Sequence, residues 1–202
     1  IPVTNERSVN LLVNHSFERD IDTEDGGWSS IKCNNSVIET VHGNAYIGSR
    51  ALHMCNCECT EENGVVQTEY LWKKGKQTSS AYVYLPSDFD NSAGAGVFLR
   101  VTDKAGNVIA ESEKVRNATP GYTRIWVPFD AGETKSIKLS IVIKGRGSVY
   151  VDAAQLEDNP TANEYNMIEN GSFTSGLSCW SDSLAEGNVH IGTSLTINDY
   201  QS

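Results

Sequence analysis

The segment "SIKLSIVIKGRGSVYVDAAQLE", residues 136–157, decides the fold of this chain. Its first half carries an apolar residue at every second position: Ile137, Leu139, Ile141 and Ile143. A period of two places these side chains on one face of an extended strand. The Gly-containing segment 144–148 then provides a turn, and "SVYVDAAQL" continues as a second strand that ends near Leu156. We therefore predict two strands joined by a turn.

The same alternation recurs upstream in "SSAYVYLP" (79–86), "AGVFLRVTD" (95–103) and "YTRIWVPF" (122–129). Between two such strands, "DKAGN" (103–107) has the composition of a hairpin turn. Almost no helical period occurs anywhere in the sequence. Many short strands without intervening helices predict an all-β fold, an antiparallel sandwich or barrel.

An internal repeat suggests how the chain is divided. The opening "NLLVNHSFERDIDTEDGGW" (10–28) matches "NMIENGSFTSGLSCW" (166–180) in the order of its Asn, apolar, Ser-Phe and Trp positions. We expect one sandwich over residues 8–159 and a linker over 160–165. Residues 166–202 are then either the start of a second, truncated module or a C-terminal segment that packs on the first.

The bulk properties exclude several classes of function. Sixteen basic and 26 acidic residues give a formal net charge of −10 and a pI of about 4.8, which disfavours binding to nucleic acid. No apolar run is long enough for membrane insertion. None of the four histidines lies in a nucleophile elbow or a zinc-protease motif, and "AGAG" (93–96) enters a strand instead of a phosphate-binding helix. We therefore expect no enzyme activity.

Several stretches together resemble a known family: "NLLVNHSFE", "VVQTEYLWKKGKQTSSAYVYL", "YTRIWVPF" and "SVYVDAAQLE", within residues 10–157. They resemble the galactose-binding-like jelly-roll carbohydrate-binding modules. More narrowly, they are similar to modules found in tandem in large secreted or surface proteins of Gram-positive bacteria, some with RHS/YD repeats. The resemblance implies an antiparallel jelly-roll β-sandwich that is secreted or at the bacterial cell surface. Its partners would be a glycan or polysaccharide and neighbouring modules of the same chain.

The function that the resemblance implies is non-catalytic carbohydrate binding. A structural spacer or adhesion module without a glycan ligand is the alternative. The resemblance also implies a structural Ca²⁺ site where the first motif meets the last strand. The residues at the matching positions are the carbonyl of Ser16, the carboxylate of Glu18, a carbonyl near Arg50 and the carboxylate of Asp152. Oxygen ligands of this kind suit Ca²⁺, although Glu18 and Asp152 could equally make hydrogen bonds only.

Candidate glycan-binding residues follow from the alternation. If Ile125, Val127 and Phe129 face the core, the side chains between them face outward. By this count the outward aromatic and basic residues are Tyr82, Tyr84, Phe98, Arg100, Arg124 and Trp126. They would form one strip if their strands belong to one sheet, and would be separated if the strands divide between two sheets. A site at the loop tips, with Trp28, Asn34, Asn35 or Trp72, is the alternative. Because Trp28 and Trp180 occupy matching repeat positions, Trp28 is more simply structural.

The cysteines allow three interpretations. In "HMCNCEC" (53–59), His53 and three cysteines occupy every second position. Imidazole and thiolate ligands of this kind can hold Zn²⁺. On a straight strand, however, the four side chains would be too far apart to coordinate one ion tetrahedrally. A disulfide from Cys33 to one of the three is the second interpretation, and free thiols are the third. Cys179 is the remaining cysteine, so the number is odd.

Overall fold

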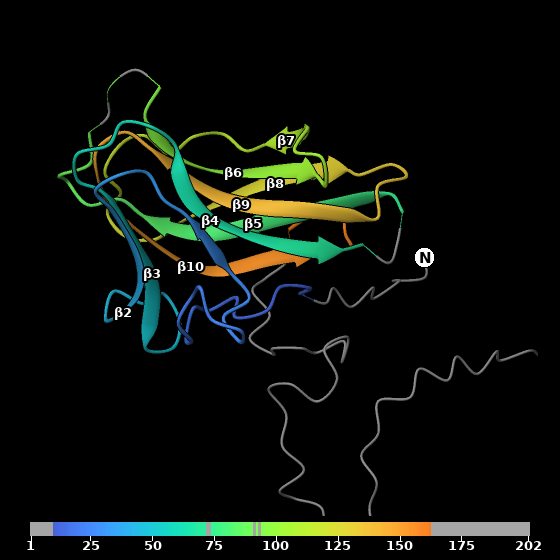
Figure 1. Ribbon diagram of the computed structural model, residues 1–202, viewed down its shortest axis with the longest axis horizontal. Coiled ribbons are helices and arrows are strands. Elements are labelled where there is room, and N and C mark those ends of the chain that lie inside the picture. Colours follow the sequence, from blue (N-terminus) through green and yellow to red (C-terminus); the bar gives the residue numbers. More distant parts are fainter. Residues whose placement is uncertain (1–9, 72–73, 91, 93, 163–202) are drawn as a thin grey trace, which may run out of the picture.

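The computed structural model describes residues 10–71, 74–90, 92 and 94–162. These residues form ten strands in two five-stranded antiparallel sheets, and no helix occurs among them (Figure 1). The prediction of an all-β antiparallel sandwich is confirmed. The repeat copy at 166–180, Cys179 and the predicted second module or tail lie outside the described residues, as do residues 163–165 of the predicted linker.

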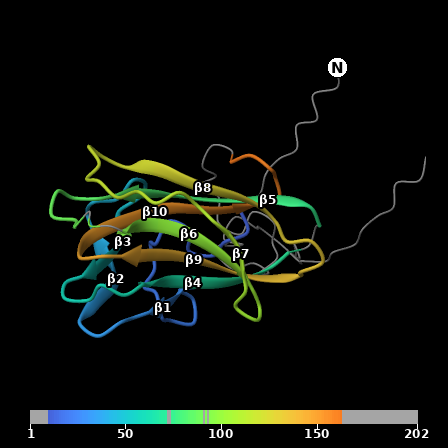
Figure 2. The ribbon, with the colours of Figure 1, turned by 90° about the horizontal axis from the view of Figure 1, so that it is seen from above.

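The first sheet, called the β4/β9 sheet below, has the order β1-β4-β9-β6-β7. Its strands are β1 (Ser29–Ile31), β4 (Asn63–Tyr70), β9 (Ser136–Lys144), β6 (Gly96–Asp103) and β7 (Val108–Glu111). The second, called the β5/β10 sheet, has the order β2-β3-β10-β5-β8. Its strands are β2 (Ser36–His42), β3 (Arg50–Asn56), β10 (Gly147–Glu157), β5 (Lys76–Tyr84) and β8 (Thr123–Asp130). Figure 2 shows the edge strands β1 and β8 on opposite sides of the molecule.

The core lies between the two sheets and is built by the predicted alternation. The four apolar residues of β9 named above are fully buried, and Val149 and Val151 of β10 are buried with them in the same cluster. The turn between β9 and β10 crosses from one sheet to the other, so the two strands are neighbours in sequence but not in pairing. Glycine is required in this turn: a Cβ on Gly145 would lie 2.6 Å from the Cβ of Ala95.

The opening motif ties the N-terminal segment to the last strand. The buried Asn10 side chain donates a hydrogen bond to the Ala154 carbonyl (2.9 Å) and accepts one from the Leu156 amide (3.0 Å). The indole of Trp28 is buried, donates to the Asn14 carbonyl (3.2 Å) and lies 5.4 Å from the Phe17 ring. The structural role predicted for Trp28 is confirmed, and it removes Trp28 from the loop-tip site.

Two disulfides close the end of the molecule around β3. Cys33 pairs with Cys59, which confirms one of the predicted alternatives, and Cys55 pairs with Cys57, which the sequence analysis did not predict. Because these four cysteines are bonded to one another, neither free thiols nor a zinc site describes them. In the parts of the chain that the structure describes, no group of three or more His, Cys, Asp or Glu residues could hold a metal ion.

Candidate glycan-binding face

The outer face of the β5/β10 sheet gathers aromatic side chains from several strands. Strand register places Tyr82 of β5 opposite Arg124 of β8, and Tyr84 of β5 opposite Tyr150 of β10. Tyr150 in turn lies opposite His53 of β3. Neighbouring strands are about 4.8 Å apart, so side chains in one row across the sheet can touch.

Five tyrosines and one histidine form a connected series of ring contacts. We call the five, Tyr46, Tyr82, Tyr84, Tyr122 and Tyr150, the tyrosine face. From one side, ring-centroid distances are 5.0 Å for His53–Tyr150, 5.9 Å for Tyr150–Tyr84, 5.9 Å for Tyr84–Tyr122, 5.5 Å for Tyr122–Tyr46 and 4.0 Å for Tyr46–Tyr82. These rings are half-buried to exposed, and Tyr46 is 45% exposed. A flat apolar ligand can therefore reach them.

Backbone hydrogen bonds hold the Tyr46 loop over this face. One carboxylate oxygen of the buried Asp152 accepts the amides of Tyr46 (2.8 Å) and Ile47 (2.9 Å). Burial raises the pKa of Asp152 to about 6, although the hydrogen bonds from the backbone amides of Ile47, Ala153 and Tyr46 act in the opposite direction. The Tyr122 hydroxyl also donates to the Asn44 carbonyl in the same loop, and burial raises the pKa of Tyr122. Tyr46 is thus positioned by its amide hydrogen bond to Asp152 of β10 and by stacking on Tyr82.

Arg124 and Trp126 extend the face toward the edge strand β8. Arg124 Nη2 donates to Ser80 Oγ and to Gln155 Oε1, both at 2.9 Å, and its guanidinium carbon lies 5.6 Å from the centre of the Tyr82 ring. Trp126, two residues further along β8, is 59% exposed. The outward orientation predicted for Tyr82, Tyr84, Arg124 and Trp126 agrees with these positions.

Phe98 and Arg100 do not belong to this surface. Both lie on β6 in the β4/β9 sheet, so the predicted single strip divides between the two sheets. Phe98 is fully buried, with the Arg100 guanidinium carbon 5.2 Å and the Lys114 ammonium nitrogen 4.6 Å from its ring centre. Arg100 is itself bonded to Glu62 (2.7 Å) and to Glu111 (2.5 Å). Of the two alternatives left open for the six candidate residues, a single strip is wrong for Phe98 and Arg100, because their strand belongs to the other sheet.

The carboxylates expected at the calcium site surround the Tyr46 loop. Glu18 accepts the amides of Ser49 (2.8 Å) and Arg50 (3.0 Å) and the Ser49 hydroxyl (2.8 Å). Burial raises the pKa of Glu18, but these hydrogen bonds outweigh it and leave the value below the usual one. Backbone N–H groups thus face both Glu18 and Asp152, and this arrangement suits hydrogen bonding better than metal ligation. A Ca²⁺ ion would fit only if the loop moved these amides away.

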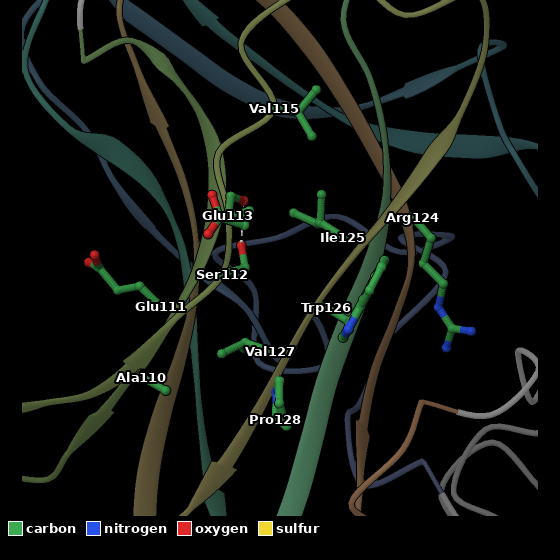
Figure 3. Close-up of a pocket in the computed structure, with 10 residues that line it drawn as sticks. All are labelled: Ala110, Glu111, Ser112, Glu113, Val115, Arg124, Ile125, Trp126, Val127 and Pro128. Atoms are coloured by element: carbon green, nitrogen blue, oxygen red, sulfur yellow. Dashed lines mark hydrogen bonds between the residues drawn. The ribbon is translucent and has the colours of Figure 1, made fainter.

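A pocket of about 520 Å³ opens where the edge strands β7 and β8 of the two sheets meet. Its walls include Glu111, Ser112, Glu113, Ile125 and Val127. Figure 3 shows Arg124 on the opposite side of β8 from Glu111 and Glu113, with its guanidinium directed away from them. The pocket therefore lies next to the tyrosine face, because Arg124 and Trp126 are among the residues that line it.

The loop-tip alternative gathers no comparable group among the described residues. Asn34 and Asn35 are exposed, and the amide of Asn35 donates to Glu58 (2.8 Å). Trp72 lies outside the described residues. The sequence analysis missed Tyr46, Tyr122, Tyr150 and His53 as members of the aromatic surface. Tyr122 and Tyr150 could have been found, because they alternate with core residues; Tyr46 lies in a loop without periodicity.

Comparisons with known proteins support the fold. No known protein-family profile and no curated protein sequence matches this chain. Among solved structures, a family 61 carbohydrate-binding module in complex with β-1,4-galactotriose is 20% identical, with a TM-score of 0.57 over 74% of this chain and 98% of that chain. The xylan-binding domain CBM22-1 of Paenibacillus barcinonensis Xyn10C is 19% identical, with a TM-score of 0.52 over 77% and 97%.

A third structure contains the CBM22-1 and GH10 modules of a Clostridium thermocellum xylanase with xylohexaose; it is 18% identical, with a TM-score of 0.54 over 83% of this chain. The match spans 32% of that longer chain. Within the described residues no helix is long and apolar enough to cross a membrane. The chain therefore has the jelly-roll sandwich fold of these carbohydrate-binding modules.

Proposed function

We propose that this chain is a non-catalytic carbohydrate-binding module and that the tyrosine face binds its glycan. The observation that carries the proposal is the connected series of accessible rings across one outer sheet face. Sugar rings present apolar C–H surfaces that pack on aromatic rings, while a few placed polar groups bind their hydroxyls. The solved structures of the same fold with galactotriose and xylohexaose support this proposal.

Each part of the face has a distinct task in this mechanism. The tyrosine rings provide the packing surface, and Arg124 and His53 lie at its two ends as polar groups. From β3 to β8 the sheet is about 14 Å wide at ordinary strand spacing, which suits several sugar units in a row. Burial lowers the pKa of His53 and so favours the neutral imidazole, which can act as donor or acceptor.

The setting that we propose is a secreted or cell-surface protein of a bacterium. Two disulfides are consistent with an oxidising compartment. Open sheet faces of this kind bind weakly, and tandem modules in the same chain would raise the avidity by multivalency. The resemblance to tandem modules motivates this part of the proposal.

The alternative is a spacer or adhesion module without a glycan ligand. One observation favours it: Tyr46 stacks on Tyr82 and the other rings contact one another, so the cluster stabilises the sheet without any ligand. The two functions differ in whether the protein binds a glycan. A glycan array probed with the 202-residue chain separates them.

In that experiment we expect binding that Tyr84→Ala and Trp126→Ala each weaken. Binding unchanged in both variants would place the site elsewhere. If the folded protein binds no glycan on a broad array, the spacer function is favoured. Repeating the array with EDTA tests the accompanying proposal that the Tyr46 loop moves its amides away and a structural Ca²⁺ binds at Glu18 and Asp152.

A further inference from the structure

Arg124 has neutral hydrogen-bond partners, unlike three other cations of the described residues, which pair with carboxylates. Arg50 pairs with Asp20, Lys74 with Glu133, and Arg100 with both Glu62 and Glu111. The hydrogen-bond partners of Arg124 are a hydroxyl, Ser80 Oγ, and an amide oxygen, Gln155 Oε1. A positive charge without a carboxylate partner therefore lies on the tyrosine face of a protein whose net charge is −10.

The guanidinium is held in place and still has donors to offer. Both hydrogen bonds come from Nη2, while Nε is buried and has no acceptor among the described residues. Nη1 makes no hydrogen bond within the described structure and is not among the buried atoms, so it reaches solvent. The Tyr82 ring lies on one side of the guanidinium. A rigid, partly satisfied guanidinium is well suited to charge-assisted binding of an anion.

We propose that the glycan bound on this face is acidic and that Arg124 binds the carboxylate of a uronic acid residue. This inference rests on the proposed function and specifies its ligand. The sugar ring that carries the carboxylate would pack on Trp126, which is exposed on the same side of β8. Nη1 would then donate to a carboxylate oxygen.

The acidic groups nearest in the fold do not already neutralise Arg124. Asp152 lies on β10, with β5 between it and β8, and its oxygens accept backbone amides. Glu111 and Glu113 lie on the other side of β8 (Figure 3). The overall negative charge repels an acidic polymer at a distance, but salt screens that repulsion beyond about 8 Å at physiological ionic strength. Selection of an acidic glycan would therefore depend on the local contact with Arg124.

Matched acidic and neutral ligands test this inference. We would titrate the 202-residue chain calorimetrically with trigalacturonate and its methyl ester, and with xylo-oligosaccharides with and without a glucuronic acid substituent. The expected result is that the acidic member of a pair binds about tenfold or more tightly than its neutral counterpart, because hydrogen bonds to a charged group are the stronger ones. In Arg124→Gln the two members should bind about equally, and Arg124→Lys should retain part of the preference.

Arg116→Gln is the matched control, because it removes the same charge from an exposed position beside β6 of the other sheet. It should leave the preference unchanged, and thermal melts of each variant establish that it is folded. Equal or tighter binding of the neutral members to the wild-type chain would overturn the inference while keeping the proposed function. An acidic preference that survives Arg124→Gln would also overturn it. Absence of binding to every ligand would contradict the proposed function itself.

Discussion

Tyr46 and Tyr82 stack face to face, with ring centroids 4.0 Å apart and planes inclined by 13°. Tyr82 belongs to β5, whereas Tyr46 belongs to the loop between β2 and β3. The two are brought together because Asp152, which lies opposite Tyr82 in the register of β10, accepts the Tyr46 amide. The aromatic surface is therefore shared between a strand and a loop that the sheet itself holds in place.

The ring contacts predict the effect of removing one tyrosine. Tyr84→Ala takes out the ring that connects Tyr150 with Tyr122, and glycan affinity should fall about tenfold, as is usual for an aromatic anchor. Titration with the best ligand from the array measures this loss. Tyr70→Ala, at an exposed tyrosine of the other sheet, is the control and should change nothing. A larger loss with Tyr70→Ala than with Tyr84→Ala would contradict the assignment of the face.

The opening motif predicts a specific loss of stability. Asn10→Ala removes the bonds to Ala154 and Leu156 that attach the N-terminal segment to β10 and leaves their backbone groups without these partners. The free energy of unfolding should fall by about 2 kcal/mol, as for a lost buried hydrogen-bonding side chain. Urea denaturation measures it. Asn34→Ala, at an exposed position, should be neutral; equal effects of the two changes would show that the motif is not structural.

The raised pKa of Glu69 predicts how the free energy of unfolding depends on pH. Burial raises the pKa of Glu69 from 4.5 to about 7 in the folded chain. Between these values the folded state keeps a proton that the unfolded state releases, so the free energy of unfolding falls as pH rises from 4.5 to about 7. Glu69→Gln should reduce this slope by on the order of 1 kcal/mol per pH unit. The comparison requires denaturation curves at several pH values, with the exposed Glu113→Gln as control; an unchanged slope in Glu69→Gln would refute the assignment.

The disulfide pairing predicts a peptide map. Trypsin cleaves after Lys32, Arg50 and Lys73, which places Cys33 in one peptide and the other three paired cysteines in the next. Without reductant, mass spectrometry should find these two peptides linked through Cys33–Cys59, with the Cys55–Cys57 bond inside the second. The Cys33→Ser, Cys59→Ser double variant should lose about 3 kcal/mol of stability, the usual effect of opening a loop of this length. Unlinked peptides from protein handled without reductant would contradict the pairing.

The calcium proposal predicts a change in melting temperature. If Ca²⁺ binds at Glu18 and Asp152, the chain should melt several degrees higher in millimolar Ca²⁺ than in EDTA, because a ligand of the folded state stabilises it. Asp152→Asn should remove the difference. Equal melting temperatures in the wild-type chain would exclude the ion and leave both carboxylates as acceptors for the Tyr46 loop.

Local sequence pattern predicted the strands and the direction of their side chains. The alternation from Ile137 to Ile143 is visible because one face of β9 packs in the core while the other does not. The same alternation along β8 placed Trp126 on the outer face of its strand. Applied to β10, it would have placed Tyr150 on the outer face as well. The alternation of side chains along a strand depends only on neighbours in sequence, so it can be recognised without knowing how the strands are arranged.

The assignment of strands to sheets could not be predicted in this way. The alternation predicts that both Phe98 and Tyr82 point away from the core, yet their strands belong to different sheets. Which strands pair depends on contacts between residues that are distant in the sequence. The position of Tyr46 depends on a buried aspartate that is far away in the sequence, and no local pattern signals it. The disulfide between Cys55 and Cys57 was likewise not signalled by spacing alone.

The most direct test of glycan binding at the tyrosine face is an NMR titration of the isotope-labelled 202-residue chain. The ligands would be β-1,4-galactotriose, xylohexaose and trigalacturonate, each added separately. We expect at least one ligand to cause saturable chemical-shift changes that are largest at Tyr82, Tyr84, Arg124 and Tyr150. Saturable changes confined to the β4/β9 sheet, or no change with any of the three, would contradict the central claim.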